Sequence, residues 1–270
     1  MTTILFETMG AVARITLNRP AQRNALDSAA LHALSQALDR AESATEVRVV
    51  IVRGAGGSFS SGFDLKEQME RRPSGEVEWG PILRRGFDTI MRFWHCPKPT
   101  IAAVDGPCLA AGCELALACD VTIASQAAVF GEPELKFGAG IVVMLLPWLV
   151  GPKAAQEIIL TGADRVSAER AREIGMVNRV VPAAELDASA LQLARHVAEI
   201  DPELVKQTKR AINRMLEVQG MLQGLEAALA IDLAIEGAGS PDKVRFMEIA
   251  RREGLRRALA WREARFPGAS

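Results

Sequence analysis

The chain begins with two β-rich segments, Ile4–Glu7 and Ala11–Leu17, on either side of Met9-Gly10. Glycine between two such segments is typical of a hairpin turn. The following segment, Ser28–Glu42, repeats leucine at helical spacing, which predicts an amphipathic helix. The first part of the chain is therefore predicted to form a hairpin followed by a helix.

Short apolar runs in the middle of the chain are typical of buried strands. They are Val47–Val52, Thr100–Val104 and Val121–Ala124. The charged stretch Lys66–Pro81 contains proline and glycine, so we expect a mobile surface loop there. A helix up to about Trp94 follows the loop, and another begins at about Ala111. This alternation of strands and helices indicates an α/β unit.

The pattern changes after Val181-Pro182, where only helical periodicity remains. The predicted helices are Leu186–Ala198, Pro202–Glu217, Leu222–Ile235, Pro241–Arg251 and Leu255–Arg265. We therefore divide the chain near residue 200, into an α/β core (1–200) and a helical C-terminal region (201–270).

Composition changes this picture little. Of the 270 residues, 49% are hydrophobic and 24% are charged, which is ordinary for a globular protein. The net charge of −1 argues against nucleic acid or an anionic membrane as a partner. The longest apolar run, Ala139–Gly151, is shorter than the roughly 20 residues that a membrane helix needs.

The four cysteines form no Cys-x-x-Cys pair, and the N-terminus carries no secretory signal. A reducing, cytoplasmic location is therefore expected. Gly54-Ala-Gly-Gly57 lacks the further residues of a nucleotide-binding loop, so a tight turn is the better interpretation. Histidine spacing supports no metal site, and His95-Cys96 is a weak candidate for a nucleophile pair, because adjacent residues seldom face each other.

The carboxylates are the stronger candidates for chemistry. Glu114 lies within an apolar segment, where an unpaired carboxylate is costly. Glu132 and Glu134 flank Pro133 at a predicted turn. The residues alone leave two interpretations open. Glu114 is either an ordinary helix-start carboxylate beside loop charges, or one of a pair that serves as base and acid in an enclosed site.

Seven groups of residues stand out by their order along the chain. They are Leu17-Asn-Arg-Pro20 with Asn24-Ala-Leu26, Phe59-Ser-Ser-Gly-Phe-Asp-Leu65, Pro97-Lys-Pro-Thr-Ile-Ala-Ala-Val-Asp-Gly106, Gly112-Cys-Glu-Leu-Ala-Leu-Ala-Cys-Asp120, Phe130-Gly-Glu-Pro-Glu-Leu135, Leu160-Thr-Gly162 and Gly175-Met-Val-Asn-Arg-Val-Val-Pro182. Together they resemble the motifs of the crotonase, or enoyl-CoA hydratase/isomerase, superfamily. The resemblance implies an α/β spiral of ββα units, followed by a helical trimerisation region.

The same resemblance assigns roles to individual residues. Glu114 and Glu134 match the two glutamates with which hydratases activate water and protonate the α-carbon. Phe63 and Ala111 match the positions whose backbone N–H groups form the oxyanion hole for the thioester carbonyl. Five positions match CoA-binding positions of the family: Arg23, Ala25, Ser61, Leu65 and Lys66. Arg23 and Lys66 correspond to basic positions near the CoA phosphates, although ordinary surface charges would look the same.

One segment departs from the family. Typical hydratases carry P-x-x-G-G-T after the second glutamate, whereas this chain has Gly138-Ala-Gly-Ile-Val-Val-Met-Leu-Leu-Pro-Trp148. Val142 and Val143 are therefore expected at a helix start, as apolar walls of a remodelled acyl pocket. The alternative is repacking of a core helix without effect on substrate.

The resemblance implies an enoyl-CoA hydratase. It needs no metal and no separate cofactor, because coenzyme A is part of the acyl-CoA thioester substrate. A double-bond isomerase, or another crotonase-family acyl-CoA enzyme, is the alternative. A non-catalytic RNA-binding protein is the hypothesis from another class, and the charge balance opposes it. The C-terminal helices carry two apolar faces, Leu222–Ile235 and Leu255–Trp261, that need a cover. Together with the resemblance, they predict a homotrimer or a dimer of trimers.

Overall fold

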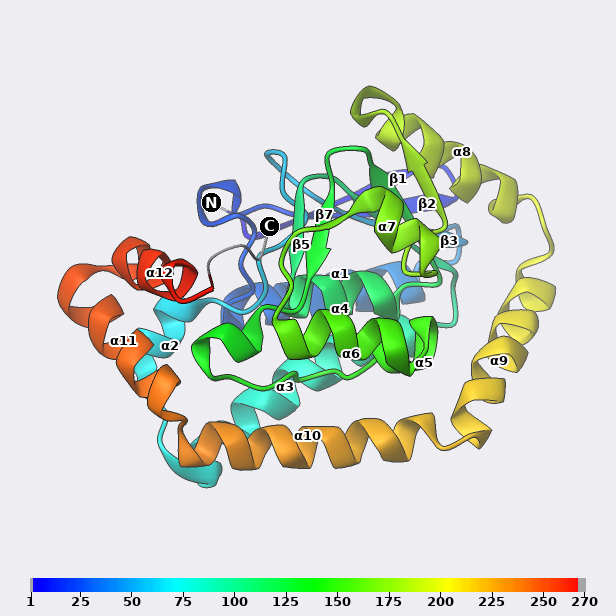
Figure 1. Cartoon of the computed structure of the whole chain (residues 1–270). Coiled ribbons are helices and arrows are strands. Elements are labelled where there is room, and N and C mark those ends of the chain that lie inside the picture. Colours follow the sequence, from blue (N-terminus) through cyan, green and yellow to red (C-terminus); the bar gives the residue numbers. More distant parts are fainter. Residues whose placement is uncertain (1, 267–270) are drawn as a thin grey trace.

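The computed structural model describes residues 2–266 (Figure 1). The larger sheet has the strand order β1 (Ile4–Met9), β2 (Val12–Leu17), β3 (Val49–Gly54), β4 (Thr100–Val104), β6 (Val121–Ser125) and β9 (Arg179–Val181). The smaller sheet has the order β5 (Pro107–Leu109), β7 (Val129–Gly131) and β8 (Val166–Ser167).

Twelve α-helices and three short 3-10 helices surround the sheets in this part of the chain. The helices are α1 (Ser28–Ser43), α2 (Leu65–Arg71), α3 (Gly75–His95), α4 (Ala111–Ala118), α5 (Leu146–Val150), α6 (Pro152–Thr161), α7 (Ala168–Glu173), α8 (Leu186–Ala198), α9 (Pro202–Val218), α10 (Met221–Ala238), α11 (Pro241–Glu253) and α12 (Leu255–Ala264). The 3-10 helices are η1 (Pro20–Gln22), η2 (Glu134–Phe137) and η3 (Ala183–Glu185).

In the middle of the chain, a strand of the larger sheet is followed by a strand of the smaller sheet, and this order then repeats. β4 lies in the larger sheet and β5 in the smaller one, and β6 and β7 repeat this pattern after α4. Within each sheet these successive strands pair in parallel. This repeated path is the predicted spiral, and the α/β fold class is confirmed.

The predicted hairpin and first helix are also confirmed. β1 and β2 pair antiparallel from Ile4 opposite Leu17 to Met9 opposite Val12. The Asp27 side chain caps α1 by accepting a hydrogen bond from the backbone N–H of Ala30 at 2.7 Å. Such a cap satisfies one of the N–H groups that a helix start leaves free.

The predicted loop over Lys66–Pro81 is wrong, because α2 and the start of α3 occupy this stretch. Asp64 caps α2 by accepting hydrogen bonds from the next backbone N–H groups. Pro81 lies inside α3 on its exposed side, while Trp79 and Leu83 are buried on the other side. Burial of this apolar face outweighs the local cost of the proline.

The larger sheet separates two parts of the core. On one face, Val50 and Val52 of β3 belong to the main cluster beneath α1, α3 and α4. On the other face, Val49 and Ile51 pack against α8. Alternate residues of one strand thus face opposite layers, as the period of two requires.

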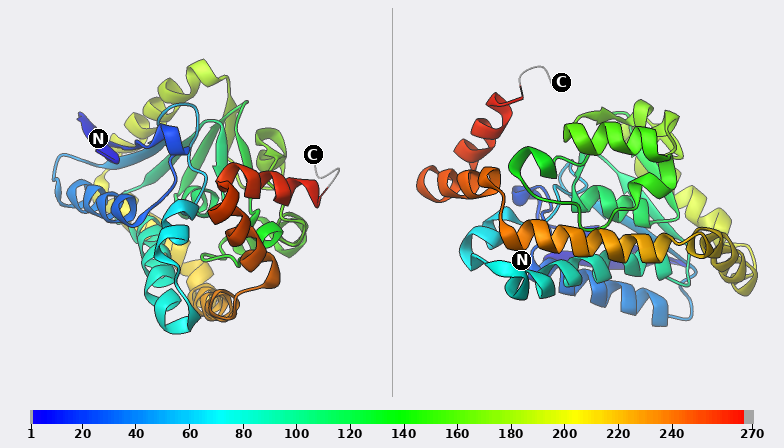
Figure 2. Two further views of the ribbon diagram at one scale, coloured as in Figure 1. Left: turned by 90° about the vertical axis from the view of Figure 1, so that its left-hand side faces the viewer. Right: turned by 60° about the horizontal axis from the view of Figure 1, so that its bottom comes forward.

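The last four helices extend around the core (Figure 2). α10 runs along α3, and α11 packs against α2 and η2. α9 stands at the edge of the molecule between α8 and α10 (Figure 1). The division of the chain near residue 200 stays a prediction, and positions 267–270 of its second part lie outside the described residues.

No single helix in residues 2–266 is long and apolar enough to cross a bilayer. α9 and α10 together pass a test of length and composition, but they are bent by 59° relative to each other.

Candidate active site

Glu114 lies in the first turn of α4, where the chain turns sharply from β5 into the helix. The turn residue Ala110 has φ 55°, a backbone conformation that costs a non-glycine residue about 1–3 kcal/mol. Glu114 is only 1% exposed. One of its oxygens, Oε1, accepts a hydrogen bond from the backbone N–H of Val143 at 2.9 Å, and Oε2 has no partner among residues 2–266.

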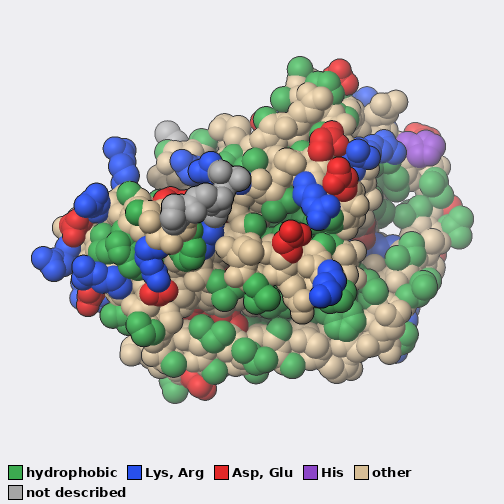
Figure 3. All heavy atoms as spheres, in the orientation of Figure 1, with side chains coloured by type: hydrophobic (Ala, Val, Ile, Leu, Met, Phe, Trp, Pro, Cys, Tyr) green, Lys and Arg blue, Asp and Glu red, His purple; other side chains and the backbone are tan. Residues whose placement is uncertain are grey.

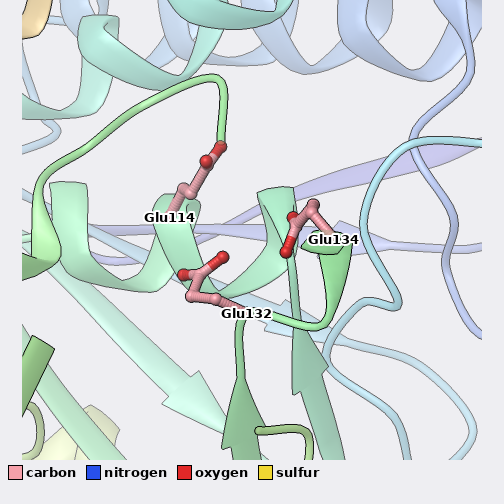
Figure 4. Close-up of side chains that lie close together, drawn as sticks. All are labelled: Glu114, Glu132 and Glu134. Carbon is pink, nitrogen blue, oxygen red and sulfur yellow. The ribbon is translucent and has the colours of Figure 1, made fainter. Parts of the chain in front are cut away.

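Two further glutamates approach Glu114 from the turn that follows β7 (Figure 4). Glu132 and Glu134 are 1% and 8% exposed, and each has one carboxylate oxygen, Oε2, without a partner in the described part of the chain. One oxygen from each of the three glutamates lies within 4.8 Å of the others. The interpretation as ordinary loop charges is therefore wrong for both residues.

Burial raises the pKa of all three carboxyl groups, because an ionised carboxylate is disfavoured in an apolar environment. The pKa of Glu134 is raised by burial to about 8. The pKa of Glu114 is raised well above its usual range by burial and by the charge of Glu134. Burial, the neighbouring Cys113 and the other two glutamates raise the pKa of Glu132 in the same direction. Full ionisation of the cluster is therefore disfavoured at neutral pH, and the protons leave in steps that belong to the group.

Carboxylates at this spacing are also a ligand set that hard cations accept. We assign no metal ligand here, and the expectation of a metal-free site stays a prediction.

The two expected oxyanion-hole donors lie side by side. A Cβ on Gly62, next to Phe63, would stand 2.6 Å from the Ala110 Cβ and 3.2 Å from the Ala111 nitrogen. Within residues 2–266, neither the Phe63 nor the Ala111 N–H donates a hydrogen bond. Two free backbone N–H groups on neighbouring segments are the kind of donors that stabilise an oxyanion, and this role of Phe63 and Ala111 stays a prediction.

The expected CoA-binding residues lie on adjoining segments. The Ser61 N–H donates to the Arg23 carbonyl at 3.0 Å, which places these two residues together. Ala25 is buried in the same segment. Leu65 and Lys66 begin α2 immediately afterwards. Their contact with CoA stays a prediction.

The expected helix start at Val142 and Val143 is wrong. Both residues lie in the segment between η2 and α5, and α5 begins only at Leu146. Their side chains are buried, while the Val143 N–H is directed to Glu114. The Val143 N–H thus bonds to Glu114 rather than to a carbonyl within a helix. That Val142 and Val143 line the acyl pocket stays a prediction.

The sequence reasoning missed two acidic residues. Glu132 was weighed only with the loop charges, although it belongs to the buried cluster. Asp232, on α10, was not considered at all. It is 2% exposed, and its charge acts on Glu114 and Glu134. The sequence did contain a pattern that indicates Asp232, because this residue interrupts an apolar stretch of helix just as Glu114 does.

The weaker sequence candidate, His95-Cys96, gains no support. Cys96 is 1% exposed, and burial raises the pKa of its thiol to about 11. A nucleophilic cysteine needs the opposite shift.

Known proteins resemble this chain throughout its length. The pattern of the family described as "Enoyl-CoA hydratase/isomerase" matches residues 7–234. The crystal structure of an enoyl-CoA hydratase/isomerase from Xanthobacter autotrophicus Py2 is 70% identical, with a TM-score of 0.97 over 98% of this chain and 99% of that one.

Curated proteins are also similar to this chain over most of their length. The short-chain-enoyl-CoA hydratase of Clostridium acetobutylicum is 37% identical, and the match covers 85% of this chain and 86% of that protein. The 2,3-dehydroadipyl-CoA hydratase of Escherichia coli is 35% identical, and the match covers 85% of this chain and 87% of that protein.

The paired sheets, the spiral path and these likenesses define an acyl-CoA enzyme of the crotonase superfamily. Within that class, the chain belongs to the enoyl-CoA hydratase/isomerase family.

Proposed function

We propose that this enzyme is a hydratase that adds water across the 2,3-double bond of a trans-2-enoyl-CoA. The observation that carries the proposal is the pair of buried carboxyl groups, Glu114 and Glu134, beside two free backbone N–H groups. Hydration needs a base for water and an acid for carbon, and a pair that holds one proton between its members provides both.

In the proposed reaction, the ionised Glu114 removes a proton from water as the water oxygen bonds to C3. The electrons of the double bond move to the thioester carbonyl and form an enolate. Glu134 then donates its proton to C2. Glu114 ends protonated and Glu134 ionised, and transfer of that proton restores the starting state.

The Phe63 and Ala111 N–H groups would stabilise the enolate oxygen. A fixed donor of this kind contributes about 3–4 kcal/mol in other enzymes. Because the addition of water is redox-neutral, the proposal requires no separate cofactor. We also propose a cytoplasmic location, because all four cysteines are free thiols, as in a reducing compartment.

The absorbance of an enoyl thioester tests the proposal. Loss of the conjugated absorbance on adding enzyme, with formation of a 3-hydroxyacyl-CoA, is the expected result. A displaced double bond without added water would identify an isomerase instead. No change across a panel of enoyl-CoA esters would support a binding role.

Double-bond isomerisation is the second candidate. Glu114 Oε1 already accepts the Val143 N–H, and the adjoining side chains Val142 and Val143 are apolar. These features leave few polar groups to hold a water molecule, whereas isomerisation needs only a proton shuttle, which resemblance places at Glu134.

We expect crotonyl-CoA to be a poor substrate compared with longer, cyclic or aryl enoyl-CoA esters. The branched side chains of Val142 and Val143 favour apolar contact with a larger acyl group, and such pockets discriminate by roughly 1–3 kcal/mol per methylene. The measurement is kcat/KM for each ester, in the unmutated enzyme and in Val142→Gly. The substitution should reduce the ratio of kcat/KM between the larger esters and crotonyl-CoA. A wild-type preference for crotonyl-CoA would contradict this expectation.

We propose a homotrimer or a dimer of trimers, with α9 at the contact. This helix exposes a row of large apolar side chains: Leu204, Ile212, Met215 and Val218. Figure 3 shows hydrophobic side chains gathered at the right-hand edge, where α9 lies in Figure 1. By contrast, Leu255–Trp261, expected to share this role, packs against α11 and η2 within the chain.

Light scattering at micromolar concentration should therefore give a mass at least three times that of the chain. Ile212→Glu places a charge in the apolar row and should lower that mass. Lys206→Glu, which places the same side chain on the opposite, charged side of the same helix, is the matched control and should leave the mass unchanged. A monomer mass for the unmutated protein would rule out this assembly.

A further inference from the structure

Asp232 is a buried carboxylate that the proposed reaction does not use. It projects from the middle of α10, a helix that otherwise packs apolar side chains such as Leu229 against the core. The residue is 2% exposed, and neither carboxylate oxygen has a hydrogen-bond partner within the described residues. A buried group in this state is costly and calls for a functional reason.

The carboxylate of Asp232 lies directly against the backbone that follows Glu134. A Cβ on Gly140 would stand 2.0 Å from Asp232 Oδ1, so only glycine leaves room for the carboxylate there. The same backbone segment, three residues later, donates the Val143 N–H to Glu114. One backbone segment thus meets Asp232 at Gly140 and Glu114 at Val143.

We propose that Asp232 is a positioning residue: from α10 it holds a negative charge behind the 138–145 segment and thereby keeps a proton on the Glu114–Glu134 pair. The inference rests on the proposed function in giving that pair the roles of base and acid. The charge acts on both glutamates and raises the pKa of each. Burial raises the pKa of Asp232 to about 6, below the value of about 8 for Glu134, so Asp232 ionises before Glu134.

Other charged groups face this region and must be considered. Lys243 of α11 lowers the pKa of Asp232, but its ammonium is already ion-paired with Glu236. Arg262 of α12 lowers the pKa of Glu134, and it is held by Asp164 at 3.3 Å. From α3, Glu76 lies near Gly237 and is exposed. Both cations are therefore shared with other carboxylates, and burial lowers the pKa of Lys243 to about 7, so Lys243 carries only part of its charge at neutral pH.

Asp232→Asn removes the charge and keeps the shape. Activity requires one ionised and one protonated glutamate, so kcat/KM follows a bell-shaped pH profile. The negative charge raises both pKa values, hence its removal should move both limbs of the bell to lower pH, by about one unit. Asp232→Leu should move them in the same way and raise the melting temperature, because it removes a buried charge without leaving a polar group.

Glu226→Gln is the matched control. It removes one negative charge from the same helix, but Glu226 is exposed and paired with Arg84. Its profile should coincide with that of the unmutated enzyme. A folded Asp232→Asn variant that loses activity with an unmoved bell would reduce Asp232 to a packing role and overturn the proposal.

A second measurement does not depend on which reaction the enzyme catalyses. In protein labelled with ¹³C at the glutamate carboxyl carbons, the signals of Glu114 and Glu134 are identified by their loss in the Gln variants. Their titration midpoints should fall in Asp232→Asn. If hydration is absent but the midpoints fall, only the proposed function fails; unmoved midpoints overturn the role of Asp232.

Discussion

Replacing Glu114 or Glu134 by glutamine is expected to lower kcat for hydration by about 100- to 10,000-fold. Glutamine keeps the size of the side chain but neither accepts nor donates the transferred proton. Each variant should still bind a CoA ester, because the expected CoA-binding residues lie on separate segments. Steady-state kinetics with the best enoyl-CoA substrate, together with titration of a CoA product, measures both effects.

The double variant should be little worse than either single one, because residues that act as a unit have strongly non-additive effects. Hydration near the wild-type rate by Glu114→Gln would contradict the two-carboxylate mechanism. Isomerisation near the wild-type rate by the same variant would instead establish the second candidate.

Measurement of the free energy of unfolding at several pH values checks whether these variants fold. Burial raises the pKa of Glu134 from 4.5 to about 8. Between these values the unfolded chain ionises Glu134 while the folded protein keeps it protonated, so this residue makes stability fall as pH rises. Glu134→Gln should remove this contribution to the fall in stability. The free energy of unfolding of the variant, minus that of the unmutated protein, should therefore increase from pH 5 to pH 8.

Gly62→Ala is expected to lower kcat by about 100- to 1,000-fold, as the loss of one oxyanion donor does in other enzymes. The new Cβ would stand 2.6 Å from Ala110 Cβ and 3.2 Å from the Ala111 nitrogen. The two segments must therefore separate, and the Phe63 and Ala111 N–H groups no longer converge on one oxygen. Single-turnover kinetics measures the change without interference from product release.

Gly57→Ala is the matched control for this experiment. Gly57 has φ +72°, close to the +90° of Gly62, but a Cβ there meets no atom within 4 Å. Both variants carry the strain of a left-handed alanine, about 1–2 kcal/mol, but only Gly62→Ala crowds the donors. Equal losses of kcat in the two variants, or full activity of Gly62→Ala, would contradict the assignment of the oxyanion hole.

The sequence alone determined the elements whose signals are local. The strands Thr100–Val104 and Val121–Ala124 and the helix Leu186–Ala198 were predicted nearly to their ends. Short apolar runs and helical periodicity report which faces are buried, and burial drives both kinds of element. The Lys66–Pro81 stretch was missed because composition cannot reveal that Trp79 and Leu83 have a core to enter.

The sequence also singled out Glu114, since a carboxylate in an apolar segment needs a reason wherever it lies. Its partners were decided only by the tertiary structure. Glu132 and Glu134 reach it from the turn after β7, the strand that pairs with β5. Asp232 reaches the same region from a helix more than ninety positions later in the chain. Charge interactions depend on distance through space and on burial, and neither quantity is written in sequence spacing.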